Sequence, residues 1–206
     1  QDARPPFPPS TALSRFPHEL GAPAAPLFDD FPSAPIAAAS LCQVYNARLE
    51  GPSWVAVKFP RPNLTFILRR DLVLLRALCV LTAPFLPLNL GFGLGSIIDE
   101  FGRSLFEEID YEQEADNAER FATLFADNPA VYVPRVERML SSTHVLTTTW
   151  IEGSKMRNSQ ELIDQRLDPA ALIRTGVICG LQQLLEFGYF HADPHPGNLF
   201  ALSGQT

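Results

Sequence analysis

The 206-residue sequence lacks the positive charge that a nucleic-acid-binding protein needs. It has 16 lysine and arginine residues against 23 acidic ones, and its formal net charge is −7. Binding to phosphate backbones requires clustered basic residues, whereas here they are scattered and only Arg69 and Arg70 are adjacent. The composition therefore excludes nucleic acid as a partner. The apolar fraction of 46% is typical of a globular protein with a hydrophobic core.

The sequence also has little cysteine. Cys42, Cys79 and Cys179 are far apart and form no CxxC pair. This pattern provides neither a disulfide framework nor a zinc site, and it is typical of a reducing compartment. We expect the three side chains to act as small core hydrophobes. The first residues contain no basic region followed by an apolar one, so they do not resemble a targeting peptide.

One long apolar stretch is present. Residues 72–98 contain a single charge, Arg76, and are long enough for a membrane span. The second half of the stretch contains residues that interrupt helices, namely Pro84, Pro87, Gly91, Gly93 and Gly95. We therefore favour a packed helix over 71–81 followed by an apolar loop, with a true span as the alternative. The pattern is also compatible with a surface that touches lipid.

The remaining segments predict an α+β chain. The proline-rich residues 1–33 predict an extended segment over a domain surface, with a turn or two of helix at 14–20. Two strands are predicted at 44–49 and 54–59, and Lys58 shares one face of the second strand with Trp54 and Ala56. Further helices are predicted over 99–127, kinked or split, and over 168–188. Further strands are predicted at 131–133, 145–151 and 199–202.

The strongest functional signal is FHADPHPGNL at residues 190–199. Its two prolines predict a rigid, non-helical loop. Asp193 and Asn198 have the spacing of the kinase catalytic loop, HxDxxxxN, in which the Asp accepts a proton from the attacking hydroxyl and the Asn binds magnesium. Two alternatives remain. In the first, His191, Asp193 and His195 bind a transition metal, since all three are ligand types at alternate positions of an extended loop. In the second, the segment is a capped turn whose histidines hydrogen-bond to the backbone.

Three further segments are weaker signals. Lys58 ends the apolar strand VAVK and could meet nucleotide phosphates, although many edge strands end in lysine. An acidic helical region contains Glu108, Asp110 and Glu114, which could equally form a solvated helix face. Glu108 and Glu114 would point in different directions on one helix, so we expect two separate roles, with Glu114 orienting Lys58 in an ion pair.

The third of these segments is rich in alanine. Residues 35–40 (PIAAAS) precede the first hairpin, at the position where a typical kinase has a glycine-rich loop over the phosphates. Alanine disfavours positive φ and would stiffen this turn. Taken alone, the segment is more typical of an ordinary helix start or packed turn.

In this order, the segments resemble the UbiB (aarF-domain) family of atypical kinase-like proteins. The matching stretches are residues 35–44 (PIAAASLCQV), 55–58, 107–121 (EEIDYEQEADNAERF), 145–153 and 190–200. The resemblance implies that Ala37, Ala38, Ala39 and Ser40 form the nucleotide loop and that the hinge around Ile151 contacts adenine through its backbone. It also implies that Lys58 and Glu114 are the nucleotide-binding pair, that Asp193 is catalytic and that Asn198 binds magnesium. Glu108 and Asp110 match a regulatory ExD pair that meets an N-terminal KxGQ extension.

Three departures from the family pattern are visible. The sequence contains no KxGQ upstream, residues 199–206 contain no acidic residue for a DFG-type metal ligand, and Thr149 replaces an acidic residue common before the hinge tryptophan. We expect the first two to mean that the sequence is a fragment. Because two metal ligands normally hold the phosphates, we expect the fragment alone to be inactive.

The resulting prediction is an α+β, protein-kinase-like two-lobe fold with a truncated C-lobe. The Pro-rich segment covers 1–33, the N-lobe 34–152 and the partial C-lobe 153–206. The resemblance implies an ATP- or ADP-binding, magnesium-dependent kinase or ATPase linked to isoprenoid quinone or other prenyl-lipid metabolism, with a membrane or prenyl-lipid pathway enzymes as partners. It favours a plastid location over a mitochondrion or the bacterial cytoplasm at the membrane. The alternatives are a non-catalytic, nucleotide-gated scaffold and, less favoured, a metal-dependent hydrolase built on His191, Asp193 and His195.

Overall fold

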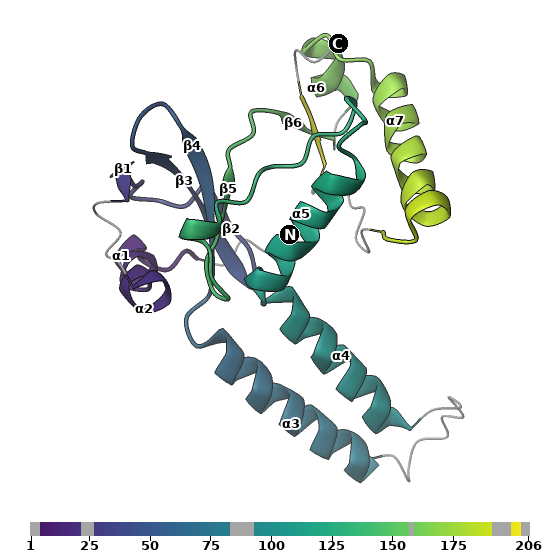
Figure 1. Cartoon of the computed structure of the whole chain (residues 1–206). Coiled ribbons are helices and arrows are strands. Elements are labelled where there is room, and N and C mark those ends of the chain that lie inside the picture. The colour runs from purple at the N-terminus through teal and green to yellow at the C-terminus, as the bar shows by residue number, and fades with distance from the viewer. Residues whose placement is uncertain (1–4, 22–26, 83–92, 157–158, 191–198, 203–206) are drawn as a thin grey trace. The chain divides into compact units, whose positions relative to one another are not determined.

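The structure is a computed structural model that describes residues 5–21, 27–82, 93–156, 159–190 and 199–202 (Figure 1). The chain divides into two compact units. The first comprises residues 1–119 and 135–150, and the second comprises residues 120–134 and 151–206. Residues 120–134, which the sequence assigned to the N-lobe, thus group with the second unit.

The first unit contains an antiparallel sheet. Its strands are β1 (Phe28–Asp30), β2 (Ala37–Ala38), β3 (Cys42–Leu49), β4 (Trp54–Pro60) and β5 (Leu146–Thr149). They follow the order β1-β3-β4-β5, and β2 pairs with the other end of β3. Lys58 on β4 lies opposite Val44 on β3 and Leu146 on β5. The predicted hairpin is confirmed, and both of its strands extend slightly beyond the predicted bounds.

The alternation of side chains along β4 places Lys58 away from the main aromatic core. Val55, Val57 and Phe59 have exposed fractions of 1%, 0% and 0% and belong to one buried cluster. Trp54, Ala56 and Lys58 lie on the other face, where β4 is more exposed. The predicted two-sidedness of this strand is therefore confirmed, and it leaves the lysine amine accessible.

The N-terminal segment is more helical than the extended segment that its prolines predicted, and the turn or two of helix predicted at 14–20 is confirmed. Residues Pro9–Leu13 form helix α1 and Phe16–Leu20 form helix α2, each with proline in its first turn, where proline is compatible with a helix. The ring of Phe16 is fully buried, with its centroid 5.3 Å from that of Phe28 and 5.4 Å from that of Phe59. The segment therefore contributes to the core of the sheet.

Three helices connect β4 to β5: α3 (Leu64–Thr82), α4 (Leu94–Glu108) and α5 (Tyr111–Leu124). The helix predicted at 71–81 begins seven residues earlier, directly after Asn63, whose φ is 57°. The predicted split of the acidic region is confirmed, since α4 and α5 are separate helices. Helices α3 and α4 lie side by side (Figure 1). Within the described residues, no helix has both the length and the apolarity needed to cross a membrane.

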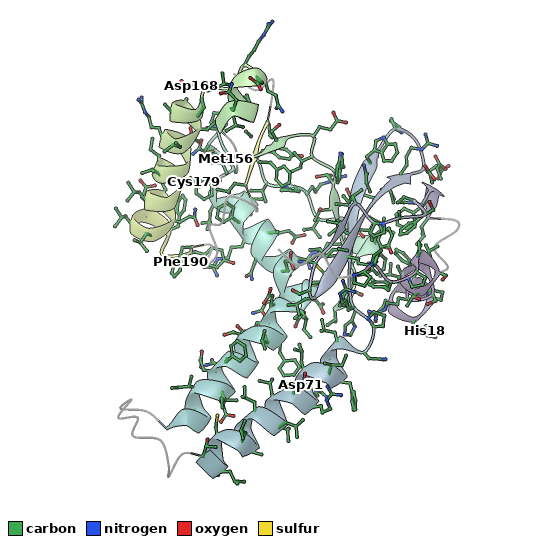
Figure 2. The ribbon with its side chains drawn as sticks, turned by 180° about the vertical axis from the view of Figure 1, so that it is seen from behind. His18, Asp71, Met156, Asp168, Cys179 and Phe190 are labelled. Atoms are coloured by element: carbon green, nitrogen blue, oxygen red, sulfur yellow. The ribbon has the colours of Figure 1, made fainter. Side chains whose placement is uncertain are left out.

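The second unit is mainly helical. It contains β6 (Ser154–Lys155) paired with β7 (Phe200–Ala201), helices α6 (Ser159–Asp164) and α7 (Pro169–Gln182), and a π-helical turn, η3 (Gln183–Phe187). Asp168 caps α7 by accepting a hydrogen bond from the Ala170 backbone N–H, at the end of the helix opposite to Cys179 (Figure 2). Gly188 ends the helical stretch with φ 59°, as predicted.

The strand predicted at 131–133 is wrong. The Asn128 side chain accepts a hydrogen bond from the Ala130 N–H, and its carbonyl accepts one from the Val131 N–H. These local bonds form a turn, which competes with strand pairing. The residues that follow, 135–145, belong to the first unit and contain isolated bridges at Val136 and between Ser142 and Val145, together with a short 3-10 helix, η2 (Arg138–Leu140).

Candidate functional site

The centre of the candidate site is an ion pair between Lys58 of β4 and Glu114 of α5. The Lys58 Nζ lies 2.9 Å from Oε1 and 2.8 Å from Oε2 of Glu114, so both carboxylate oxygens accept from the amine. The side chains are 26% and 40% exposed. The predicted pair is thus present, and because it is only partly covered, the lysine can also meet a ligand.

Tyr111 supports this pair from within the same helix. The Lys58 Nζ lies 4.8 Å from the centre of the Tyr111 ring, a distance at which a cation and an aromatic face attract each other. Tyr111 is 1% exposed, and its N–H donates to the carbonyl of Thr143. The sequence prediction missed this residue, although Tyr111 is three positions before Glu114, a spacing that puts both on one helix face.

Cys42 lies against Tyr111 and belongs to the environment of the pair. Burial raises the pKa of the Cys42 thiol, and the carboxylates of Glu114 and Glu108 raise it further, against the opposing effect of Lys58. Burial also raises the pKa of Tyr111, with smaller contributions from Cys42 and Glu114. Both groups are therefore neutral at physiological pH, so Cys42 behaves as the small core residue that the sequence predicted.

The alanine-rich segment forms a tight turn beside this site. Ala37 and Ala38 form β2 and pair with Val44 and Gln43 of β3, and the Ala39 N–H donates to the Cys42 carbonyl at 2.8 Å. Ser40 and Leu41 lie between β2 and β3. Among the described residues other than glycine, positive φ occurs at Asn63 and Arg166 and not in this turn. The turn therefore needs no left-handed residue, and alanine fits where glycine is usual.

Arg61 holds the alanine turn in place. Its Nε and Nη2 donate to the Ala39 carbonyl at 3.0 and 2.8 Å, and its Nη1 donates to the Pro5 carbonyl at 3.1 Å. The Arg61 N–H also donates to the Leu41 carbonyl at 2.9 Å. One guanidinium thus joins the turn to the N-terminal segment, a role that nothing in the sequence motif indicated.

The two residues of the predicted ExD pair have different surroundings. Glu108 is the last residue of α4 and is exposed. The Asp110 Oδ1 accepts from the N–H groups of Glu112 and Gln113 at 3.1 and 3.3 Å, so Asp110 caps α5. Glu108 and Glu114 lie on separate helices, and their expected separate roles stay a prediction.

The structure does not place the other predicted site residues relative to the Lys58–Glu114 pair. Asp193, Asn198, His191 and His195 lie outside the described residues, so their roles stay predictions. Ile151 begins the second of the two segments that form the second unit, directly after Trp150 of the first unit. Across the described ranges, no cluster of three or more His, Cys, Asp or Glu side chains could hold a metal ion.

Comparisons with known proteins agree with this architecture. A family model described as the ABC1 atypical kinase-like domain matches residues 1–206. The protein ACTIVITY OF BC1 COMPLEX KINASE 1, chloroplastic, of Arabidopsis thaliana is 43% identical over 98% of this chain and 30% of its own length. A probable protein kinase UbiB of Pseudomonas paraeruginosa is 35% identical over 97% of this chain and 38% of its own length.

A solved structure shares the fold. The complex of Rv3197 with erythromycin from Mycobacterium tuberculosis matches with a TM-score of 0.73 and 31% identity, covering 97% of this chain and 49% of that one. The chain therefore spans about a third of the length of these curated relatives and half of the solved chain. By its family match, its relatives and its kinase-like α+β fold, the chain belongs to the ABC1 atypical kinase-like family, which includes proteins named UbiB.

Proposed function

We propose that this chain is the nucleotide-binding part of an atypical kinase or ATPase that uses ATP or ADP with magnesium. The observation that carries the proposal is the Lys58–Glu114 pair, in which both carboxylate oxygens hold a partly exposed lysine amine. In kinases, a lysine on a strand and a glutamate on a helix form this pair, and the lysine meets the α- and β-phosphates.

The surrounding residues fit a bound nucleotide. Lys58 would neutralise phosphate charge, and the turn at Ala37–Ser40 would lie over the phosphates without needing the flexibility of glycine. In the same proposal the Ile151 backbone would contact adenine, Asn198 would hold magnesium, and Asp193 would accept the proton of the attacking hydroxyl. The nucleotide would supply the phosphoryl group. Lys58 would orient its phosphates, and Asp193 would hold the proton taken from the attacking hydroxyl.

The relatives extend the proposal to a pathway and a compartment. One of them is named chloroplastic, and another is named UbiB. We place the longer protein in a plastid, in a prenyl-lipid or isoprenoid quinone pathway, with the enzymes of that pathway as partners. The exposed Glu108 and the α5 cap Asp110 would be the surface that a regulatory KxGQ segment contacts.

The test is magnesium-dependent binding of ATP and ADP to the 206-residue chain, measured by thermal shift and by titration with a fluorescent nucleotide. Lys58→Met should weaken binding at least about tenfold, because one charged contact to phosphate is worth roughly 1.5–3 kcal/mol. Arg48→Met is the matched control, since Arg48 is a basic residue of the same hairpin and stacks over Trp54. Equal binding by both variants would contradict the proposal.

Measurements of turnover, bound zinc and the Lys58→Met and Asp193→Asn variants distinguish the alternative functions. A non-catalytic scaffold predicts nucleotide binding with no turnover by the longer protein, and an Asp193→Asn variant identical to wild type. A metal hydrolase predicts stoichiometric zinc in the purified protein, with no effect of Lys58→Met. A kinase or ATPase predicts turnover that requires both Lys58 and Asp193.

A further inference from the structure

The outer half of helix α3 exposes an unusual amount of apolar surface. Only its first residue, Leu64, is buried along the whole helix. Five large apolar side chains of its second half are more than half exposed: Val73 67%, Leu74 62%, Leu78 59%, Val80 65% and Leu81 73%. Soluble proteins rarely expose apolar side chains so densely unless the surface contacts a partner or a membrane.

The distribution of these side chains around helix α3 indicates whether the exposed surface contacts a protein or a membrane. At 100° per residue, the side chains from Val80 through Leu81 and Leu74 to Leu75 span an arc of about 220°. The remaining side faces α4, where Leu72 lies close to Gly102. A protein groove usually receives a helix through a stripe of about 100°. A lipid environment surrounds a helix and favours apolar residues on every side that protein does not cover.

The charges of this region point the same way. Arg76 is the only charged residue between Asp71 and Asp99. It donates to the Asp99 Oδ2 of α4 at 3.1 Å, so the charge is neutralised within the helix pair. The Thr82 hydroxyl donates to the Leu78 carbonyl at 2.9 Å, which satisfies a polar group inside the helix. The exposed charges Arg69, Arg70 and Arg103 lie nearer the other end of the pair.

We propose that the outer end of the α3–α4 pair, residues 72–82 and 93–98, inserts into one leaflet of an uncharged lipid surface. Residues 72–82 extend about 16 Å at 1.5 Å per residue. This is roughly half of the ~30 Å hydrocarbon thickness of a bilayer, which agrees with a helix that enters a membrane without crossing it. Because Arg76, the one charged residue of the inserted part, is paired with Asp99 at its border, apolar burial drives the contact. The contact lies on a surface other than the nucleotide site, so either proposal can fail alone.

The experiment is flotation of the purified chain with phosphatidylcholine vesicles at low and high salt. The wild type should float with the vesicles under both conditions, because screening weakens charge attraction and leaves apolar burial intact. The double variant Leu78→Glu/Leu81→Glu should lose at least about tenfold in vesicle affinity, because a carboxylate in the hydrocarbon is costly. Met139→Glu is the control, since Met139 is 89% exposed in η2 of the same unit. Phe66→Glu tests the inner end of α3, where a 67% exposed ring should contribute little.

Several outcomes would overturn the proposal. They are absence of vesicle binding by the wild type, binding only to anionic vesicles with loss at high salt, or equal loss in Met139→Glu. A wild-type dimer that the double variant dissociates, without vesicle binding, would assign the surface to a second copy of the chain. Circular dichroism and nucleotide-induced thermal shift, both unchanged in the double variant, establish that its folding is intact.

Discussion

Replacing Glu114 with glutamine removes the charge that faces Lys58 and keeps the shape of the side chain. The Coulomb attraction of two charges 2.8 Å apart is about 1.5 kcal/mol in a water-like dielectric. Since the pair is 26% and 40% exposed, solvent screens it, and ordering both side chains offsets part of the attraction. A net loss of about 0.5–1 kcal/mol of stability is therefore expected, which lowers the melting temperature by roughly 1–4 °C.

The effect on nucleotide binding should be larger than the effect on stability. In Glu114→Gln the amide oxygen can still accept from the Lys58 amine, but the second acceptor and the negative charge that fix the direction of the amine are lost, while its contact with the Tyr111 ring remains. We expect the affinity for magnesium–ATP to fall about tenfold in a fluorescence titration of the Glu114→Gln variant, which is about 1.4 kcal/mol.

Glu119→Gln provides a matched control. Glu119 is on the same helix and pairs with Arg138 at 2.7 Å, on the exposed surface. This variant should show a small change in melting temperature and unchanged nucleotide affinity. If Glu114→Gln bound ATP as well as Glu119→Gln, Glu114 would not orient the lysine for a ligand. A fall in melting temperature far beyond 4 °C would refute the screening argument.

Three further changes test the rest of the structure. Phe16→Ala should cost about 3–5 kcal/mol in urea unfolding because it empties a fully buried aromatic site; a cost under about 0.5 kcal/mol would instead fit a segment lying on the surface. Arg61→Lys keeps the charge but cannot donate the same fork to Ala39 and Pro5, so nucleotide affinity should fall about fivefold, or by roughly 1 kcal/mol, while Arg48→Lys leaves it unchanged. Burial raises the pKa of Tyr111, so the folded chain keeps a proton that the unfolded chain loses near pH 10. The contribution of this protonated side chain to the free energy of unfolding is complete below about pH 10 and declines above it. In urea unfolding, the free energy of unfolding of Tyr111→Phe should therefore fall less steeply above about pH 10 than that of wild type. The exposed Tyr132→Phe should match wild type.

The features that the sequence predicted best depend on short-range periodicity. The alternation along β4 assigned Lys58 to the face opposite Val57 and Phe59, and the structure confirms it. The sequence of 99–127 has one apolar stripe that ends at Ile109 and a second that begins six residues later at Ala115, a shift that predicted a kink or two helices; the structure has two helices, α4 and α5. Both patterns repeat within a few residues, so the sequence contains all the information that they need.

The features that the sequence missed depend on contacts between distant residues. The N-terminal prolines favoured an extended segment with a turn or two of helix at 14–20; α2 confirms that turn, but helix α1 and the burial of Phe16 among Phe28, Phe31 and Phe59 were not predicted. The fork from Arg61 to Ala39 and Pro5 joins positions 22 and 56 residues apart. No local pattern specifies such a bond. Among the features that the sequence prediction missed, Tyr111 differs, because its spacing of three residues from Glu114 could have indicated that both lie on one helix face.

Asp110 shows how a local structural role and a proposed regulatory role can meet in one residue. Its carboxylate caps α5, the helix that carries Glu114, so any loss of the cap would loosen the partner of Lys58 as well. A change in nucleotide binding in Asp110→Ala therefore cannot by itself assign a regulatory contact. Asparagine caps a helix about as well as aspartate but has no charge. Asp110→Asn should thus preserve stability and nucleotide affinity in the 206-residue chain, and a difference that appears only in the longer protein would assign the charge to a contact outside α5.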